Sequence, residues 1–298
     1  MSQLPIGRSV SVDVPASTAN LGPGFDALGV ALGWRDTMTL SVAAEPSFDL
    51  SGVGAETVPR DETHLVIRAA RAGFDALGVP APALSLSAHN TIPHGSGLGS
   101  SAAAVVAGAA AAWGLTRPGV DPDPEWLLQV TFGFEGHGDN LAAAIGGGAV
   151  LAWQDGAPRH VALPVDHTVR AVAYTTEVSV ATRSARGVLP ETVPHADAAA
   201  NAGRAALLVH ALTARPDLLF EATEDRLHQQ YRADLMPESS ALVADLRERH
   251  FAAFISGAGP TVVVLGEASE LEFCEPVEGF TRHRLRIAGG VRVTSPGD

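Results

Sequence analysis

A short glycine- and serine-rich segment, Pro93–Ala102, constrains the fold of this chain more than any other feature. It follows an alternating apolar pattern over Leu84–Ala88, which predicts a strand. It opens an alanine-rich stretch over Ser100–Trp113, which predicts a buried helix ended by Gly114. Glycines let a ligand approach the backbone closely, and the free amides of a first helical turn attract anions. The segment is therefore predicted to hold a phosphate group at a helix N-terminus.

Three other interpretations of this segment are possible. A capped turn before a helix needs no ligand. Gly97–Ala102 also fits the G-x-G-x-x-A pattern of dinucleotide binding, which requires an acidic strand end about 20 residues further on. The region Gly114–Pro124 is rich in proline, glycine and aspartate, so the dinucleotide interpretation is disfavoured. A hydrolase elbow, G-x-S-x-G, fails because His94 and Leu98 flank Ser96.

The basic residues of the chain are all arginine: there are 20, and lysine is absent. This excludes the lysine of a Walker A loop, the strand lysine of a protein kinase and Schiff-base chemistry. A phosphate-handling enzyme built from this chain must therefore rely on backbone amides, a metal ion and arginine.

Composition excludes several further classes. The net charge of −13 argues against nucleic acid or an anionic membrane as a partner. Cys274 is the single cysteine, which excludes an internal disulfide and a thiolate metal cluster and favours a reducing compartment. Met1–Gly7 lacks a charged region followed by an apolar stretch, so we expect no signal peptide and a cytoplasmic location.

Apolar periodicity predicts an α+β chain of two domains, since 298 residues exceed the usual size of one domain. A break at Gln154–Pro158 sets the predicted boundary. The predicted strands are Val10–Val14 (ended by Pro15), Ala27–Val42, Leu84–Ala88, Gly146–Trp153, Val169–Thr175, Ala252–Ser256, Thr261–Leu265, His283–Ala288 and Val291–Thr294. The predicted helices are Thr63–Leu77, Ser100–Trp113, Glu125–Phe134, Ala196–Leu212, Pro216–Gln230 and Ser239–His250.

Three segments occur together in a recognisable order. They are Pro15-Ala-Ser-Thr-Ala-Asn-Leu-Gly-Pro-Gly-Phe-Asp26, Pro93–Ala102 and Ser256-Gly-Ala-Gly-Pro-Thr261. This order resembles the three-motif pattern of the GHMP small-molecule kinases and extends over nearly the whole chain. The first segment is more particular to the homoserine kinases within that superfamily.

The resemblance implies a GHMP kinase fold. Residues 1–155 would form an ATP-binding domain like the second domain of ribosomal protein S5, and residues 156–298 a ferredoxin-like domain. The implied reaction transfers phosphate from ATP to the side-chain hydroxyl of L-homoserine, giving O-phospho-L-homoserine on the route to threonine. ATP, L-homoserine and Mg²⁺ are the implied ligands, and a homodimer is left open.

The resemblance also implies site residues. Those for ATP are Pro93, Gly95, Ser96, Gly97, Leu98, Gly99, Ser100, Ser101 and Ala102. Those for the substrate are Asn20, Asp26, His137, Asp139, Asn140, Thr182, Arg186 and Arg232. Ser101 and Glu135 would bind Mg²⁺, and the implied catalytic residues are Asn140, Arg186 and Ser101. The chain departs from the family at Gly138, where proline is usual, and at His64, where asparagine is frequent beside adenine.

The chemistry of homoserine agrees with these residue types. Its ammonium needs an acid and its carboxylate a bidentate cation, which Asp26 and either Arg186 or Arg232 can supply. Phosphoryl transfer depends mostly on positioning and charge stabilisation, which amides, Mg²⁺ and arginine can provide. No carboxylate is evident as a base for the hydroxyl, and the resemblance implies that Asn140 orients it.

Singly, each of these side chains also occurs as a turn former, a helix cap or a solvated surface charge, so their joint order carries the prediction. The alternatives are another GHMP-type kinase, a non-catalytic nucleotide- or metabolite-binding member of the fold, and a nicotinamide-dependent dehydrogenase. Turnover separates the first from the second, and NADH binding would reveal the third.

Overall fold

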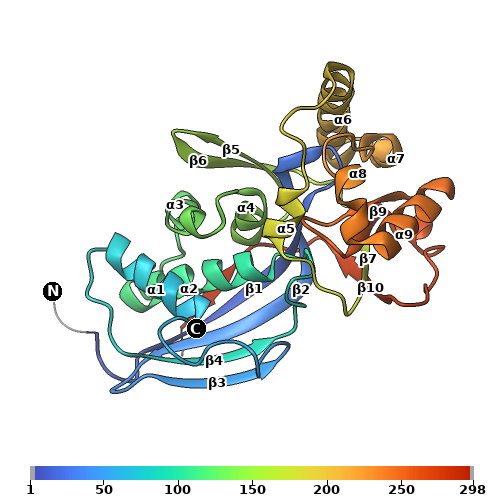
Figure 1. The fold of residues 1–298 in the computed structure, drawn as a ribbon. Coiled ribbons are helices and arrows are strands. Elements are labelled where there is room, and N and C mark those ends of the chain that lie inside the picture. Colours follow the sequence, from blue (N-terminus) through green and yellow to red (C-terminus); the bar gives the residue numbers. More distant parts are fainter. Residues whose placement is uncertain (1–3, 296–298) are drawn as a thin grey trace.

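Two β-sheets with packed helices build the molecule (Figure 1). The computed structural model describes residues 4–295. The prediction that there is no signal peptide concerns Met1–Gly7. The first three of these residues lie outside the described range. No helix within the described range is long and apolar enough to cross a membrane.

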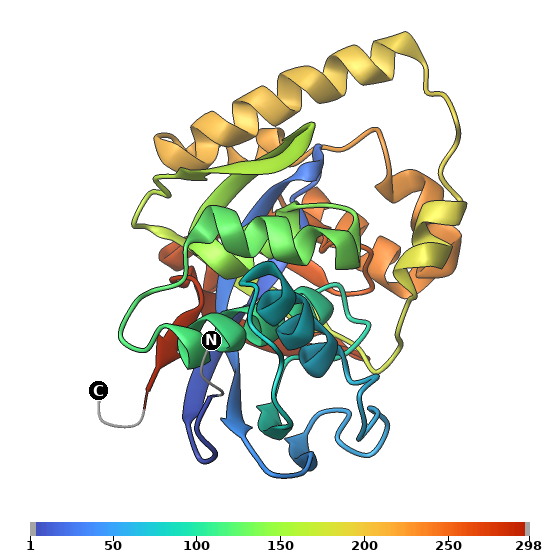
Figure 2. The same cartoon turned by 90° about the vertical axis from the view of Figure 1, so that its left-hand side faces the viewer.

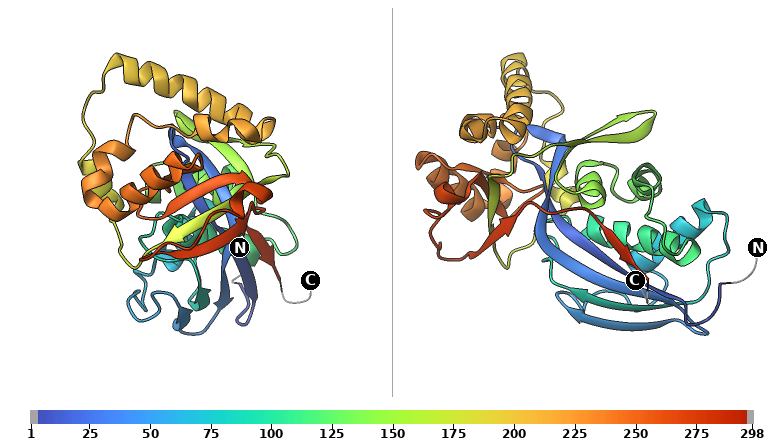
Figure 3. Two further views of the ribbon diagram at one scale, coloured as in Figure 1. Left: turned by 90° about the vertical axis from the view of Figure 1, so that its right-hand side faces the viewer. Right: turned by 180° about the vertical axis from the view of Figure 1, so that it is seen from behind.

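The first sheet has seven strands in the order β11-β1-β2-β4-β3, with β5 paired to β2 and β6 to β5. All neighbours are antiparallel except β3 and β4. Its strands are β1 (Ser9–Asn20), β2 (Gly24–Val42), β3 (Ser47–Gly52), β4 (Leu84–Asn90), β5 (Ala149–Asp155), β6 (Ala157–Leu163) and β11 (Arg292–Thr294). The C-terminal strand β11 returns to pair with β1, as the view from behind shows (Figure 3).

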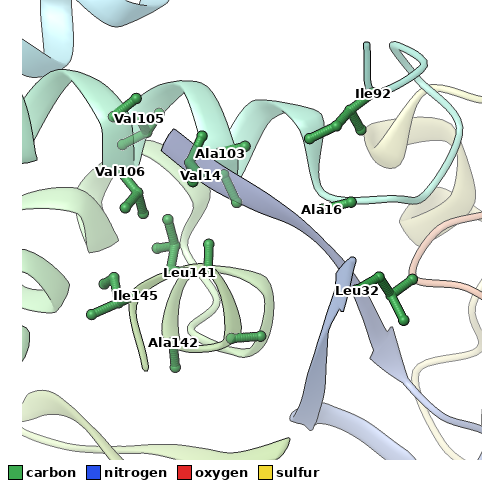
Figure 4. Close-up of a cluster of buried hydrophobic side chains, with 14 of the residues drawn as sticks. Val14, Ala16, Leu32, Ile92, Ala103, Val105, Val106, Leu141, Ala142 and Ile145 are labelled. Atoms are coloured by element: carbon green, nitrogen blue, oxygen red, sulfur yellow. The ribbon is translucent and has the colours of Figure 1, made fainter. Parts of the chain in front are cut away.

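Four helices pack on this sheet. They are α1 (Leu65–Ala76), α2 (Ser100–Thr116), α3 (Pro124–Glu135) and α4 (Asp139–Gly146). Figure 4 shows part of this core, where side chains of α2 and α4 lie near the strand residue Val14, with Ala16 and Leu32 further along the sheet. Small residues on α2 let other elements approach closely: a Cβ added to Gly108 would lie 2.2 Å from the carbonyl oxygen of Val66 in α1. The alanine-rich composition thus sets the spacing of the helix layer.

The second sheet has four antiparallel strands in the order β10-β7-β9-β8 (Figure 3). They are β7 (Val169–Thr175), β8 (Ala252–Ile255), β9 (Val262–Glu267) and β10 (Thr281–Arg286). With helices between β7 and β8 and between β9 and β10, this is the β-α-β-β-α-β order of a ferredoxin-like unit. One face of this sheet packs a second core around Tyr174 and Leu246.

The helices of this second part are mostly short. They are α5 (Thr182–Gly187), α6 (His195–Thr213), α7 (Leu219–Ala222), α8 (Gln229–Arg232), α9 (Pro237–Glu248) and α10 (Ala268–Leu271), with 3₁₀ turns at Pro216–Leu218 and Ala233–Leu235. Helix α6 runs across the top of the molecule above the β5–β6 hairpin (Figure 2).

Several predictions about element limits were wrong. The first strand does not end at Pro15, because a bulge between Pro15 and Ala16 shifts the register and lets β1 continue. Helix α2 does not end at Gly114, which lies inside the helix against Val10 and Val293, where a Cβ would not fit. The helix predicted over Pro216–Gln230 is broken into short pieces. The helices α4, α5 and α10 and the strands β3 and β6 were not predicted.

The predicted domain division at residues 155 and 156 falls in the turn between β5 and β6. Strand β6 therefore belongs to the first sheet, and β11 joins it from the far end of the chain. The mixed helix and sheet content agrees with the predicted α+β class.

Candidate active site

The glycine loop, defined as Pro93–Ala102, runs from the end of β4 into α2 and leaves the first turn of that helix open. Gly95, Gly97 and Gly99 all have positive φ, at 64°, 85° and 68°. Gly99 is the N-cap residue and offers no side-chain cap. Within residues 4–295, no protein group accepts a hydrogen bond from the amides of residues 100–102. An uncapped turn of this kind presents donors and the positive end of the helix dipole to an anion.

The segment Ser256–Thr261 holds the glycine loop from behind. The Ser256 hydroxyl donates to the carbonyl of Gly97 at 2.7 Å, and the amide of Thr261 donates to the carbonyl of Ser96 at 3.1 Å. A Cβ on Gly97 would lie 2.2 Å from the carbonyl oxygen of Ser256. The third sequence motif therefore acts mainly as a buttress of the loop.

Opposite the loop, the Asn20–Asp26 turn directs a carboxylate into the same space. Asn20 is buried; its Nδ2 donates to the carbonyl of Gly257 at 2.8 Å, and its Oδ1 accepts from the amide of Asp26 at 3.0 Å. Asp26 in turn accepts two hydrogen bonds from Arg186, Nη1 to Oδ2 at 2.9 Å and Nη2 to Oδ1 at 2.6 Å. This hydrogen-bonded pairing raises the pKa of Arg186. Asn20 thus positions an acid that already faces a guanidinium.

A second guanidinium, that of Arg232, is only 2% exposed. Its Nε donates to the carbonyl of Ala185 at 2.9 Å, and its Nη1 contacts the carbonyl of Gly257 at 3.1 Å and Nδ1 of His228 at 3.2 Å. No carboxylate of residues 4–295 forms a salt bridge with it. Burial lowers the pKa of Arg232. A buried cation that forms no salt bridge is suited to bind an anionic ligand.

The start of α4 adds a polar cluster. Asp139 is 2% exposed; its Oδ1 accepts from the amide of Asn140 at 2.7 Å and lies 2.9 Å from Nδ1 of His137. The hydrogen bond to the Asp139 carboxylate raises the pKa of His137. Ser17 on β1 donates its hydroxyl to Oδ1 of Asn140 at 2.9 Å. The glycine at position 138 keeps a helical conformation, so the departure from proline leaves this turn intact.

Ser101 and Glu135 meet at the edge of the glycine loop. The Ser101 hydroxyl donates to Oε1 of Glu135 at 2.5 Å, although the two residues are 34 positions apart. Both are oxygen donors of the kind that Mg²⁺ prefers.

One cavity collects these groups. Nearly all the predicted site residues line it; of the predicted set, Pro93 and Leu98 do not, because Leu98 is fully buried in the core and Pro93 offers its carbonyl to Ser96 within the loop. The residues that line the cavity are Asn20, Phe25, Asp26, Gly95, Ser96, Gly97, Gly99, Ser100, Ser101, Ala102, Glu135, His137, Asp139, Asn140, Thr182, Arg186, Arg232, Gly257 and Ala258.

Comparison with known proteins agrees with this geometry. The GHMP kinases N-terminal domain model matches residues 64–148, and the GHMP kinases C-terminal model matches residues 204–275. A homoserine kinase of Streptomyces coelicolor is 51% identical over 274 residues, which cover 91% of this chain and 89% of the relative. A homoserine kinase of Streptomyces avermitilis is 49% identical, covering 94% and 93%. The chain belongs to the homoserine kinase family.

The predicted GHMP kinase fold is confirmed as well. The crystal structure of a homoserine kinase from Cytophaga hutchinsonii matches with a TM-score of 0.84 at 25% identity, covering 98% of this chain and 99% of that one. As a member of the homoserine kinase family, the chain is an ATP-using kinase. The assignments of individual site residues stay predictions.

A second cavity adjoins the first and shares Gly95, Ser100 and Ser101 with it. Its other lining is more apolar, with Met38, Val58, Pro59, Leu65, Val66 and Ala104 beside Asp36, His64, Asn90 and His94. His64 caps α1 through Nδ1, which accepts from the amide of Val66 at 3.2 Å, and burial lowers its pKa. Oδ1 of Asn90 is buried and has no hydrogen-bond partner within the described residues.

Besides Gly257 and Ala258, which line the cavity, three residues around it were not predicted from the sequence. Phe25 lies beneath both guanidinium groups, with Arg186 at 5.6 Å and Arg232 at 5.3 Å from its ring centre. His228 is fully buried and stacks on Phe25; its Nε2 lies 2.8 Å from the carbonyl of Gly22, and burial lowers its pKa. Ser17 is the third. The spacing of four between His228 and Arg232 was a usable signal, since it favours side-chain contact.

Proposed function

We propose that the chain transfers the γ-phosphoryl group of ATP to the side-chain hydroxyl of L-homoserine, giving O-phospho-L-homoserine in threonine biosynthesis. The observation that supports this most is the opposition, across one cavity, of an open helix N-terminus and the group formed by Asp26, Arg186 and Arg232. One wall fits phosphate, and the other fits the two charges of an amino acid.

The substrate half is built for a zwitterion. An α-amino acid carries its ammonium and carboxylate on one carbon, so the groups that receive them must be neighbours. Asp26 and Arg186 are in contact, and Arg232 contributes a second, unpaired guanidinium to the same cavity. We assign the ammonium to Asp26 and the carboxylate to Arg232 together with Arg186. A catalytic contribution of Arg186 beyond this clamp stays a prediction.

The nucleotide half extends over both cavities. The phosphates face the amides of residues 100–102, and the adenosine lies in the more apolar second cavity. There the unpaired Oδ1 of Asn90 offers an acceptor for the exocyclic amino group of adenine, while His64 retains Nε2 for a further contact. The family frequently has asparagine at position 64, beside adenine. Here His64 would make that contact in place of asparagine.

Ser101 and Glu135 fit a magnesium site completed by phosphate oxygens and water, the usual arrangement for Mg²⁺ in phosphoryl transfer. Within residues 4–295, no group of three acidic, histidine or cysteine side chains offers a protein-only metal site. The ion would neutralise charge on the phosphate oxygens.

The chain's own residues bind and orient rather than abstract a proton. The carboxylates in the cavity are already engaged: Asp26 by Arg186, Asp139 by His137 and Asn140, and Glu135 by Ser101. A loose phosphoryl-transfer transition state places little demand on a strong base, so positioning by Asn140 and the loop amides is sufficient.

An ATP-consumption assay tests the proposal. L-homoserine should support turnover, whereas mevalonate, galactose and shikimate should not, and phosphorus NMR should identify the phosphate ester. No preference for homoserine would refute the proposal in favour of another GHMP-type kinase. Nucleotide binding without turnover of any of the four would indicate a non-catalytic member, and binding of NADH in place of ATP would indicate the dehydrogenase interpretation.

A further inference from the structure

We propose that Ser17 is a positioning residue: it fixes the carboxamide of Asn140 so that the NH₂ group, and not the carbonyl oxygen, faces the substrate. The inference rests on the proposed function, since it concerns the reaction at that same site. It assigns a task to a β1 residue that does not line the cavity itself.

Ser17 is fully buried behind the glycine loop. Its amide donates to the carbonyl of Leu98 at 3.0 Å, and its hydroxyl donates to Oδ1 of Asn140 at 2.9 Å. A Cβ on Gly99 would lie 2.1 Å from Oγ of Ser17 and 3.1 Å from Oδ1 of Asn140. The loop, the β1 hydroxyl and the Asn140 amide are therefore packed close together, and a side chain at position 99 would collide with the Ser17 hydroxyl.

The available hydrogen-bond partners determine which way the carboxamide of Asn140 points. Within residues 4–295, Oδ1 of Asn140 is the one protein acceptor of the Ser17 hydroxyl. If the amide were turned over, Nδ2 would face Ser17 and the buried hydroxyl proton would lose its partner, which is unfavourable. The main chain of Asn140 is held separately, because its amide donates to Asp139 at 2.7 Å. Ser17 thus sets the side chain, and Asp139 sets the backbone.

The orientation of the Asn140 amide determines which contacts it can make with a ligand. Asn140 lines the cavity, and Nδ2 has no protein acceptor within the described residues, so its two N–H groups remain for a ligand. A donor can orient the lone pair of the substrate hydroxyl or stabilise charge on the transferred phosphoryl group. It cannot accept the hydroxyl proton. Asn140 therefore positions the nucleophile as a donor.

The test is a double-mutant cycle. Ser17→Ala should lower kcat by about 10- to 100-fold, the size expected for misplacing a reacting group, with both KM values changed less than threefold. In an Asn140→Ala background, Ser17→Ala should have no further effect on kcat, because its action passes through that amide. Equal fold-losses in both backgrounds would overturn the proposal, as would a Ser17→Ala enzyme with wild-type kcat.

A control separates positioning from folding. Thr116→Val removes a hydroxyl at the far end of α2 that bonds only to carbonyls of its own helix. Its kcat should equal that of wild type, and its melting temperature provides a reference for Ser17→Ala. If the loss of kcat in Ser17→Ala were matched by a loss of folded protein at the assay temperature, the role would be structural and the proposal would fail.

Asn140→Asp gives an independent measurement. Aspartate still accepts the Ser17 hydroxyl, but it presents an acceptor to the cavity in place of a donor. Its kcat should fall as far as that of Asn140→Ala. Activity within threefold of wild type would show that the cavity needs an acceptor at this position. The proposed function fails separately, if wild-type enzyme does not phosphorylate homoserine at all.

Discussion

Replacing Asp26 with asparagine should damage homoserine recognition while leaving the fold nearly intact. Asp26 has φ of 57°, a left-handed conformation that asparagine tolerates well, so the backbone should not change. The side chains of Asp26 and Arg186 are 37% and 39% exposed, so their ion pair contributes at most about 1 kcal/mol to stability. The substrate ammonium would instead lose a charge-assisted contact of about 1.5–3 kcal/mol, which corresponds to about a 10- to 150-fold loss in kcat/KM for homoserine.

The assay is initial-rate kinetics with each substrate varied in turn, together with thermal melting. The KM for ATP should stay within threefold of wild type, and the melting temperature should fall by no more than about 4 °C. A matched control is Asp217→Asn, which opens an exposed aspartate–arginine pair away from the cavity and should leave the kinetics unchanged. Equal losses for ATP and homoserine, or a large fall in melting temperature, would refute the reasoning and make Asp26 a structural residue.

Four further outcomes are expected. Arg232→Met should lower kcat/KM for homoserine by roughly 100-fold or more, with little change in the KM for ATP, as initial rates would show. Gly97→Ala should weaken binding of an ATP analogue by calorimetry, since the new Cβ would lie 2.2 Å from a backbone carbonyl at a φ of 85°. Glu135→Gln should raise the Mg²⁺ concentration needed for half-maximal rate without changing the KM for homoserine. Asp139 raises the pKa of His137 above 6.5, so the charged imidazole stabilises the fold at low pH and this contribution is lost as pH rises through the raised pKa. The melting-temperature difference between wild type and His137→Gln should therefore shrink as the pH rises above about 6.5.

Local patterns predicted the long elements of the fold but not their limits. The strand Val169–Thr175 was predicted to the residue, and α1, α2 and α6 to within a few residues. Proline and glycine misled where tertiary packing decides: a bulge lets β1 pass Pro15, and close contact with β1 and β11 requires Gly114 within α2. The pairing of β11 with β1 joins segments about 280 residues apart in sequence, which no local pattern can indicate.

Most residues of the predicted site line one cavity, because they fall in compact motifs with a known order. The motifs did not indicate which way the side chains of the site point. They did not reveal that Ser17 points behind the loop toward Asn140, or that Asp26 and Arg186 pair directly. They also left Arg186 and Arg232 equivalent, and only burial and the absence of a carboxylate partner within the described residues distinguish Arg232.

The Asn20–Asp26 turn contains residues that we assign to the substrate, and its backbone also needs support from the C-terminal part of the chain. Of the four non-glycine residues with positive φ within residues 4–295, three lie in this turn: Asn20, Leu21 and Asp26. Such conformations cost roughly 1–3 kcal/mol each when the side chain does not favour them, so other contacts must hold the turn. The C-terminal part supplies these contacts: Asn201 donates to the carbonyl of Pro23 at 2.8 Å, and His228 lies 2.8 Å from the carbonyl of Gly22.

The proposed substrate site therefore forms only where the N-terminal and C-terminal parts of the chain pack together. Asp26, which we assign to the ammonium, lies on the N-terminal side, while Arg186 and Arg232 come from the C-terminal side. The carbonyl of Gly257 accepts from both Asn20 and Arg232, so a single atom links the turn to the guanidinium that we assign to the carboxylate. The glycine loop, by contrast, takes its open helix turn from the N-terminal sheet and uses the C-terminal segment only as a buttress. It follows that loosening the contact between the two parts should impair homoserine binding before it impairs nucleotide binding, because only the substrate half needs charged side chains from both.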